Sequence, residues 1–416
     1  MYGGGRVIQQ ITNDIFRYIM KGNEFNVHFQ PIVSVGKGKL IGMESLLRAS
    51  FDGEGITPGA IFSYARKEKR LYELDIFCHS HAMKQYTGER RDALLFVNVE
   101  ASLLQDYLRN RDQILEKLDR LGIARKSIVI EISERIAEDE EYLSVISQEC
   151  KKAGFLVAID DVGTKNSNLC RILKVMPDII KLDRSVINNI HKDYMKQEAV
   201  RGICEVCQRI GAIPIAEGTE LEEEVVTCML CGIDWFQGFY FDKAMSPELI
   251  RGQSYSNKCR NLAEEYRQRV NLIHKQNTVL IDRQKNVFHK LLRLAEQKNS
   301  RDEEGLLSEM VQSDPSIECI YILNEDGIQI SDTVFRDSVD IRNQITFSSM
   351  KKGDYHITKQ YYYLVVNKKK KIYVSQPYIS QLTGKLCRTI STFCKGEYVL
   401  CVDFFQNSFK DREVID

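Results

Sequence analysis

Polar side chains that can bind a cation stand near the ends of successive short apolar runs in the first part of this chain. They are Glu44, Asn98, Glu131, Asp160, Asp161, Lys181, Glu217 and Gln237. Carboxylate and amide oxygens are hard ligands, which suit Mg²⁺ or Mn²⁺ better than zinc. Crowded carboxylates would repel one another and raise each other's pKa unless a cation neutralised them. The set therefore predicts a site for divalent cations.

The amine of Lys181 adds a second function to this set. A lysine held among acids stays charged and can hydrogen-bond a metal-bound water. Divalent cations, carboxylates and such a lysine together predict two-metal hydrolysis of a phosphate ester. The histidines of this part lie outside the set, and we interpret them as ordinary core or surface residues: His28, His79, His81 and His191.

The elements that position these side chains are eight strand-like runs, mostly joined by helical stretches. The runs cover residues 27–35, 40–47, 94–100, 127–133, 155–160, 178–183, 212–217 and 234–238. Most are nearly continuous Val, Ile, Leu and Phe, as in strands that are covered on both faces. This pattern predicts a (β/α)8 barrel of the triosephosphate-isomerase type, in which the carboxyl ends of the strands meet at one mouth. An open doubly wound sheet is the alternative, although the G-x-G-x-x-G motif of dinucleotide-binding sheets is absent.

The composition divides the chain into four parts: a leader at 1–24, the barrel at 25–247, a helical linker at 248–300 and an α+β domain at 301–416. The linker is charged and lacks proline. Six apolar or aromatic residues recur in it every seven positions, namely Cys259, Tyr266, Ile273, Leu280, Val287 and Leu294. The companion positions are polar, so the heptad is half filled. We expect a long helix that packs along its own barrel or also pairs with a second subunit.

The last part has period-two, β-branched runs and predicts an antiparallel sheet. We expect strands in the runs IECIYILNEDGIQISDTVF, YYYLVV, KKIYVSQPYIS, LCRTISTF and EYVLCVDFF. Asn324–Gly327 and Leu382–Gly384 have the composition of hairpin turns. Lys368 to Lys371 are interpreted as a solvated hairpin edge rather than a binding site, because charges discourage edge pairing.

The overall composition excludes several classes of protein. Lys plus Arg and Asp plus Glu both number 58, so the formal net charge is zero. A protein that works on bulk nucleic acid or an anionic membrane would need a basic surplus. No apolar run approaches the ~20 residues of a membrane span, and the N-terminus has no signal-peptide pattern. We expect a cytoplasmic protein without membrane insertion.

Two cysteine pairs admit a different metal site. Cys204, Cys207, Cys228 and Cys231 have the spacing of a four-thiolate zinc site. Both pairs fall inside helical patterns, however, and a strand-like run lies between them. We interpret them as reduced cysteines in a helical core, and elemental analysis of the purified protein would test this interpretation.

The order of the short motifs resembles the EAL-domain family of cyclic-di-GMP phosphodiesterases. The matching segments are FQPIV, GMESLLR, FVNVE, EISE, AIDDVG, IKLD, IAEGTE and FQGF. The resemblance implies a modified triosephosphate-isomerase-type barrel with one strand reversed, usually dimeric. It implies hydrolysis of one 3′–5′ linkage of cyclic-di-GMP to linear pGpG with two divalent cations.

Roles follow from this resemblance position by position. It implies that the metal ligands are Glu44, Asn98, Glu131, Asp160, Asp161 and Glu217. Lys181 matches the lysine that orients or deprotonates the attacking water, and Gln237 matches a glutamine that completes the site. Substrate contacts are implied for Gln30, Arg48 and Asp75. Glu134 matches an acid that steadies the loop after the fifth strand.

The chain departs from the family pattern in two places. Ser45 replaces the alanine of the motif that names the family, a small-for-small change. The loop after the fifth strand reads DDVGTKNSNL where active members read close to DDFGTGYSSL, so Val162, Lys165, Asn166 and Asn168 differ. This loop couples the dimer contact to the second metal in the family. A receptor that binds cyclic-di-GMP with weak or no catalysis is therefore the alternative to an active phosphodiesterase.

The C-terminal part resembles PAS-like or Cache-like sensor modules, as found behind the EAL domain in some Bacillus-type proteins. The resembling segments are IYILNEDGIQISDTVF, YVSQPYIS, LCRTIS and VLCVDFF. Tyr378, Arg388 and Asp403 stand where such modules hold a small ligand, and bracing of the sheet is the alternative role. We expect this module to regulate the barrel in response to a small ligand or a protein partner that the sequence does not identify.

Overall fold

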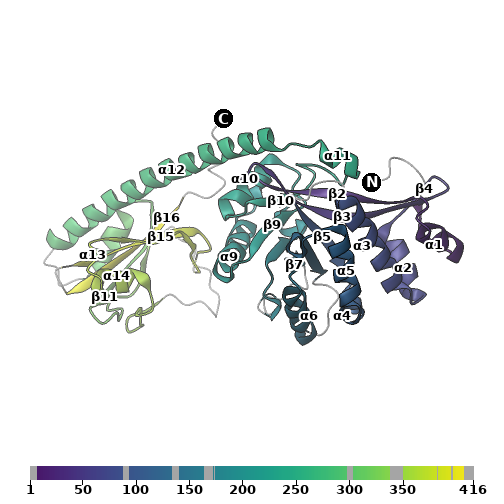
Figure 1. Ribbon diagram of the computed structural model, residues 1–416. Helices are drawn as coiled ribbons and strands as arrows, with labels where there is room; N and C mark the ends of the chain where they lie inside the picture. The colour runs from purple at the N-terminus through teal and green to yellow at the C-terminus, as the bar shows by residue number, and fades with distance from the viewer. Residues whose placement is uncertain are drawn as a thin grey trace. The chain divides into compact units, whose positions relative to one another are not determined.

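The computed structural model describes residues 7–87, 93–133, 140–163, 172, 174–297, 303–337, 350–381, 383–394 and 397–406. The chain divides into two compact units, Met1–Val270 and Asn271–Asp416 (Figure 1). None of the described helices is both long and apolar enough to cross a membrane.

Eight strands of the first unit close into a barrel in the order β3-β2-β10-β9-β8-β7-β6-β5, with β5 pairing back onto β3. Strand β2 runs antiparallel to both of its neighbours, whereas the other pairs are parallel. The predicted barrel with one reversed strand is confirmed, and the open sheet is wrong. The strands are β2 (Phe25–Ser34), β3 (Lys39–Phe51), β5 (Leu94–Val99), β6 (Ile128–Ser133), β7 (Leu156–Val162), β8 (Ile179–Leu182), β9 (Ile213–Glu217) and β10 (Trp235–Gln237).

An apolar layer fills the barrel directly beneath the predicted site. Successive side chains of a strand point to opposite faces, so residues two apart share a face. The apolar cluster Phe96, Val129, Ala158, Ile179, Ile215 and Trp235 is buried, and each member lies two positions before a predicted site residue. The barrel interior is therefore closed by packed side chains below and polar at its mouth.

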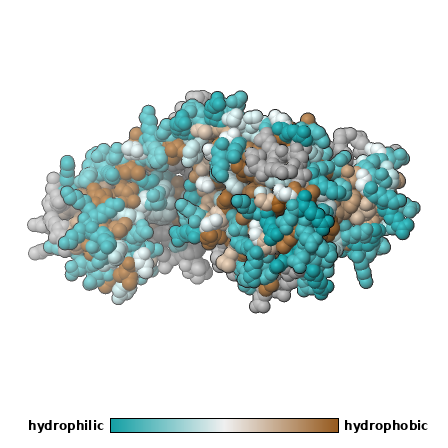
Figure 2. Space-filling model, viewed as in Figure 1, coloured by the Kyte–Doolittle hydropathy of each residue, from teal (hydrophilic) through white to brown (hydrophobic). Residues whose placement is uncertain are grey.

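Helices cover the outside of the barrel in Figure 1. Helix α9 (Tyr194–Ile210) is capped by Asp193 at its start and by Gly211 at its end, and the φ of 77° at Gly211 is the left-handed conformation of a helix C-cap. Hydrophilic residues cover most of the visible face of this unit (Figure 2), as expected for helices with one apolar stripe. The helices are α2 (Pro58–Lys67), α3 (Leu71–Thr87), α4 (Leu104–Arg109), α5 (Arg111–Leu121), α6 (Glu140–Lys152), α8 (Arg184–Ile187), α9 (Tyr194–Ile210) and α10 (Glu222–Cys231).

Residues before the barrel also pack onto it. Strand β1 (Val7–Ile8) pairs with β4 (Glu54–Ile56), and α1 (Asn13–Met20) follows it. The side chains of Phe16 and Ile19 on α1 are fully buried in the core of the first unit. This part of the segment predicted as a leader thus contributes to the barrel unit.

A long helix runs through the segment predicted as a helical linker. After the short α11 (Pro247–Arg251), α12 extends from Ser256 to Gln297. Cys259 and Leu262 near its start are buried in the core of the first unit. Phe288 and Leu291 near its end are buried in the core of the second unit. The helix therefore supplies core residues to each unit separately.

The second unit is a six-stranded antiparallel sheet with two short helices. The sheet order is β12-β11-β16-β15-β13, and β14 also pairs with β15. The elements are α13 (Glu303–Gln312), β11 (Ile317–Asn324), β12 (Val334–Phe335), α14 (Gln360–Val366), β13 (Tyr373–Val374), β14 (Tyr378–Ile379), β15 (Leu386–Cys394) and β16 (Tyr398–Phe405).

Two expectations for the second unit are wrong. The run YYYLVV forms helix α14 rather than a strand, because Tyr362 and Val365, three positions apart, are the pair that is buried. Lys368 to Lys371 are exposed as expected, but they lie in the connection from α14 to β13 and not on a hairpin edge. The predicted turn at Asn324–Gly327 is confirmed by the hydrogen bond from the Gly327 N–H to the Asn324 carbonyl oxygen.

Candidate functional site

A buried lysine occupies the centre of the barrel mouth. Lys181 comes from the middle of β8 and is 1% exposed. Its Nζ contacts one carboxylate oxygen from each of four other strands: Glu131 at 2.6 Å, Glu217 at 2.6 Å, Glu44 at 3.2 Å and Asp160 at 3.6 Å. The structure thus brings together five of the residues that the sequence predicts for the site, four at or near strand ends and Glu44 within β3.

Amide side chains hold the carboxylate of Glu44 from two sides. Asn98 Nδ2 donates to Glu44 Oε1 at 2.7 Å, and Gln237 Nε2 donates to Glu44 Oε2 at 2.6 Å. Gln30 Oε1 accepts from Gln237 Nε2 at 3.3 Å. Because these residues come from β2, β3, β5 and β10, the closed barrel is needed to bring them together.

A bulge at the end of β7 places two consecutive acids at the mouth. The pairing of β7 with β8 shifts register between Ile159 and Val162. Asp161 in between has φ of 61°, a left-handed conformation that aspartate tolerates better than most residues. Its backbone N–H donates to Asp160 Oδ1 at 2.9 Å. The bulge interrupts the alternation of the strand at the point where both acids are expected to bind metal.

The carboxylates differ in their affinity for protons. Burial raises the pKa of Glu131 well above its usual range, with the charge of Glu44 as the next cause. Burial also raises the pKa of Glu217, to about 8. Burial acts the same way on Glu44, but the charge of Lys181 and the hydrogen bonds from Gln237 and Asn98 outweigh it and lower its pKa. For Lys181, the four carboxylates outweigh burial and raise the pKa.

The chemistry of this donor set fits divalent cations. Glu131 Oε2 and Gln237 Oε1 are buried without a hydrogen-bond partner, a costly condition for polar atoms. One lysine faces four carboxylates, so the cluster has an excess of negative charge. Oxygen ligands whose negative charge exceeds the positive charge of nearby side chains suit Mg²⁺ or Mn²⁺. The residues present therefore fit the cations that the sequence predicts.

A hollow of about 310 Å³ opens above this cluster. Its wall includes Gln30, Glu44, Asp160, Lys181, Glu217 and Gln237, together with Leu46, Asp183, Arg184, Gly218, Glu220, Gly238 and Phe239. Arg48, predicted to contact substrate, is not part of this wall. Its Nη1 donates to the Leu47 carbonyl oxygen at 2.8 Å.

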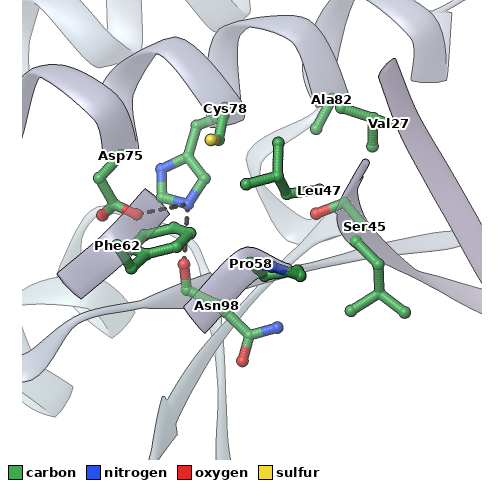
Figure 3. A pocket seen from close by; sticks show the side chains of 11 residues that line it. Val27, Ser45, Leu47, Pro58, Phe62, Asp75, Cys78, Ala82 and Asn98 are labelled. Carbon is green, nitrogen blue, oxygen red and sulfur yellow. Dashed lines mark hydrogen bonds and ion pairs between the residues drawn. The ribbon is translucent and has the colours of Figure 1, made fainter. Parts of the chain in front are cut away.

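A second hollow of about 220 Å³ shares Leu46 with the first and is shown in Figure 3. Apolar residues such as Leu47, Pro58 and Phe62 form much of its wall, and Asp75 and Asn98 are polar groups at its edge. Asp75 is 2% exposed, and burial raises the pKa of its carboxyl group. The predicted substrate residue Asp75 thus faces a hollow next to the lysine-centred cluster.

His79 also lines this second hollow and is hydrogen-bonded on both ring nitrogens. Its Nε2 lies 2.8 Å from the Asn98 carbonyl oxygen, and its Nδ1 lies 2.7 Å from the Tyr107 hydroxyl. Tyr107 in turn donates to Asp75 Oδ2 at 2.8 Å. Asp75 and His79 are four positions apart on α3, a spacing that places them on one helix face. That spacing was the signal for His79, whereas nothing in the sequence singles out Tyr107.

Lys165, Asn166 and Asn168 of the departing loop lie outside the described residues, as does Glu134 after β6. Their predicted roles stay predictions. Ser45 is described, and its hydroxyl donates to the Phe96 carbonyl oxygen at 3.0 Å, which ties β3 to β5. The change from alanine therefore adds a bond between strands next to Glu44.

The four cysteines considered for zinc lie on α9 and α10, where all are buried. In the described part of the chain, no three of these thiols lie within 4.8 Å of one another. Burial raises the pKa of Cys204 to about 12 and of Cys207 and Cys231 to about 11, so these thiols stay protonated. The arrangement supports core cysteines.

The three polar residues predicted in the second unit do not share one face of the sheet. Thr389 pairs with Asp403, and Arg388 pairs with Phe404, so Arg388 points to the opposite side from Asp403. Tyr378 joins the side of Asp403, with its hydroxyl 3.0 Å from Thr389 Oγ1. Burial raises the pKa of Asp403 to about 6.

Comparison with known proteins identifies the barrel. The family model of the EAL domain matches residues 12–244. The cyclic di-GMP phosphodiesterase PdeR of Escherichia coli strain K12 is 30% identical over 247 residues, which are 58% of this chain and 37% of PdeR. The uncharacterized EAL-domain containing protein YkuI of Bacillus subtilis strain 168 is 24% identical over 317 residues, 74% of this chain and 77% of YkuI. The chain thus spans little more than a third of the first relative.

Solved structures share the fold. The crystal structure of B. subtilis YkuI in complex with substrate c-di-GMP and calcium covers 95% of this chain and 100% of that chain, with a TM-score of 0.80 and 21% identity. At this identity the similarity concerns the fold alone. Klebsiella pneumoniae BlrP1, solved as a manganese/cy-diGMP complex, covers 54% of this chain and 56% of that chain, with a TM-score of 0.50 and 25% identity.

Proposed function

We propose, from the premise that this chain belongs to the EAL-domain family, that it hydrolyses cyclic-di-GMP to linear pGpG. The observation that carries the proposal is the contact of Lys181 with four carboxylates, one of which is also bonded to Asn98 and Gln237. A charged lysine among carboxylates that can hold divalent cations suits a site where a water molecule attacks a phosphate.

We assign the cation ligands to the residues that the sequence predicts: Glu44, Asn98, Glu131, Asp160, Asp161 and Glu217. Bound Mg²⁺ or Mn²⁺ would supply an activated water and would neutralise charge on the phosphate. Lys181 stays protonated among its carboxylates and is placed to hydrogen-bond that water. Gln237 uses its amide N–H groups to fix Glu44, which leaves its Oε1 for a further bond.

The two hollows fit the two halves of a cyclic dinucleotide. The hollow above Lys181 contains the acids and would hold the phosphate that is cut. The neighbouring hollow has apolar walls and the buried acceptor Asp75, which suits a guanine base. Arg48 would have to leave its bond with the Leu47 carbonyl oxygen to reach a substrate phosphate.

The first test is turnover of cyclic-di-GMP by the full chain with Mn²⁺ and with Mg²⁺, with the products separated chromatographically. We expect pGpG from the unchanged protein and almost none from Glu44→Ala, which removes the carboxylate that Lys181, Asn98 and Gln237 share. Glu205→Ala is the matched control, because Glu205 is an exposed carboxylate on α9. A Glu44→Ala variant that keeps most of its activity would refute the site assignment.

A receptor without turnover is the second candidate, favoured by the sequence of the loop after β7. In that case the protein would bind cyclic-di-GMP tightly in excess Mn²⁺ and leave it intact. Changing Lys165 to glycine should then raise turnover if this loop limits catalysis, because glycine allows the backbone conformations that lysine disfavours. No change in rate would show that the departure in the loop is harmless.

We further propose that the protein acts in the cytoplasm as a homodimer and that its second unit regulates the barrel. The half-filled heptad of α12 supports the homodimer, and the buried polar face around Asp403 supports a regulatory second unit. The PAS-like identity of the second unit and its ligand are part of the same proposal.

A further inference from the structure

A chain of hydrogen bonds links the second hollow to a proposed metal ligand. It runs from Asp75 on α3 through the Tyr107 hydroxyl on α4 to His79, again on α3, and ends at the Asn98 carbonyl oxygen near the end of β5. His79 is 8% exposed. In Figure 3, dashed lines mark the contacts of His79 Nε2 with Asp75 Oδ1 at 3.9 Å and with the Asn98 carbonyl oxygen at 2.8 Å.

The acceptor at the end of these hydrogen bonds fixes which ring nitrogen of His79 carries a proton. A carbonyl oxygen only accepts hydrogen bonds, so Nε2 must carry a proton to bond the Asn98 oxygen at 2.8 Å. The other end has two arrangements. Either a charged imidazole donates from Nδ1 to Tyr107, which donates to the Asp75 carboxylate, or a protonated Asp75 donates to Tyr107, which donates to Nδ1. In both, the Nε2–H group donates to Asn98.

A small shift of the Asn98 main chain would change where its side-chain oxygen points. Asn98 pairs in register with Glu131 on β6, and its side-chain Nδ2 donates to Glu44. That bond turns Oδ1 of the same amide away from Glu44 and leaves it for a cation. A bond to the Asn98 carbonyl therefore fixes the backbone that aims this oxygen. Partners that orient metal ligands in this way contribute about 10–100-fold to metal affinity.

We infer that His79 is a positioning residue that holds Asn98 in place as a metal ligand, with Tyr107 and Asp75 fixing the imidazole. The inference rests on the proposed function, since it assumes that Asn98 binds a cation. His79 itself touches neither cation nor substrate phosphate in this role.

The test is binding of Mn²⁺ alone to the full-length protein at fixed pH, measured by calorimetry without nucleotide. His79→Leu removes the donor to Asn98, and we expect Mn²⁺ affinity to fall by about 10-fold or more. His79→Gln keeps an N–H group near the position of Nε2, so it should recover most of the loss. His81→Leu is the matched control, because His81 lies on the same helix and bonds the Phe77 carbonyl oxygen of that helix instead.

Unfolding in urea without metal separates positioning from stability. A purely structural His79 would lower the free energy of unfolding but leave Mn²⁺ binding by the folded protein unchanged, which would overturn the inference. A failure of His79→Gln to bind better than His79→Leu would overturn it as well. If Glu44→Ala abolishes Mn²⁺ binding and His79→Leu does not, the proposed site stands and the inference alone fails. If the unchanged protein binds no Mn²⁺, both fail.

Discussion

At the barrel mouth, the positive charge of one lysine is set against the negative charges of the carboxylates around it. Lys181, Glu44 and Glu131 are buried and Asp160 and Glu217 are half-buried, and such a group is stable only while its members largely neutralise one another. Because negative charge is in excess, the same residues that stabilise the lysine leave a demand for further cations. Stability and metal binding are therefore expected to be linked at this site.

Replacing Lys181 by methionine should expose this linkage. The change keeps the length of the side chain but removes the charge that four carboxylates contact. Without divalent cations we expect the free energy of unfolding to fall by about 3–5 kcal/mol, the range for breaking a buried ion pair. Mn²⁺ should restore part of it. The measurement is urea unfolding of both proteins in EDTA and in Mn²⁺. A variant as stable as the unchanged protein in EDTA would contradict the charge argument.

Metal affinity should rise with pH up to about 8. The folded protein without metal keeps a proton on Glu217, whose pKa is raised to about 8, and a cation must displace it. Below that pKa, each pH unit should change the affinity by about tenfold through this one group. Above it the contribution of Glu217 should level off. Calorimetry in two buffers of different ionisation enthalpy measures the protons released, and Glu217→Gln should release fewer.

The residue types of the site were predictable, but the contacts between them were only partly so. Glu44, Glu131, Asp160, Lys181 and Glu217 could be placed at one mouth because strand ends converge in a barrel. The bond from His79 to a main-chain carbonyl oxygen could not, because it depends on how α3 packs against β5. The side of the sheet that Arg388 and Asp403 face was also not predictable, because it depends on the register between β15 and β16. A period of two shows which residues of one strand share a face, but not which residues of two strands pair.

At the scale of elements, close backbone approaches hold the site residues at the strand ends. Gly238 follows β10 directly after Gln237, and a Cβ at this position would lie 2.2 Å from the Thr219 carbonyl oxygen. Thr219 belongs to the loop just after Glu217 and is fully buried. The two strand ends that supply Gln237 and Glu217 thus touch backbone to backbone.

Gly238→Ala should therefore separate these two strand ends. We expect a loss of about 1–3 kcal/mol of stability from overpacking, together with a lower turnover as Gln237 and Glu217 move apart. Gly59→Ala is the control, since a Cβ there meets no atom within 4 Å and Gly59 lies in helix α2. Thermal unfolding and turnover of both variants check the prediction. Unchanged stability of Gly238→Ala would contradict the prediction, because it would mean that the loop containing Thr219 moves aside at little cost in free energy.

Element types were predictable where length and pattern agreed. The eight barrel runs are apolar and mostly separated by helical patterns, and all eight contain strands. The run YYYLVV is short and apolar throughout, so its sequence does not distinguish the period of two of a strand from the period of 3.6 of a helix. Its burial at Tyr362 and Val365 arises from packing against the sheet of the second unit.

For the whole molecule, α12 is the element that both units use. Its first turns belong to the core of the barrel unit through Cys259 and Leu262, and its last turns belong to the core of the second unit through Val287, Phe288 and Leu291. The middle of the helix exposes Leu272 and Val279. A boundary within this helix therefore divides two hydrophobic cores that are each complete.

Shortened chains should show this division. A fragment of residues 1–270 keeps Cys259 and Leu262 on the barrel, so we expect it to fold and to remain monodisperse. A fragment of residues 1–300 would expose Val287, Phe288 and Leu291 without the sheet that covers them, and it should associate or aggregate. Size-exclusion chromatography compares the two. If the second unit regulates the barrel, residues 1–270 should also turn over cyclic-di-GMP at a different rate from the full chain, because α12 then no longer carries the second unit. Equal rates would refute the regulatory proposal while leaving the phosphodiesterase assignment intact.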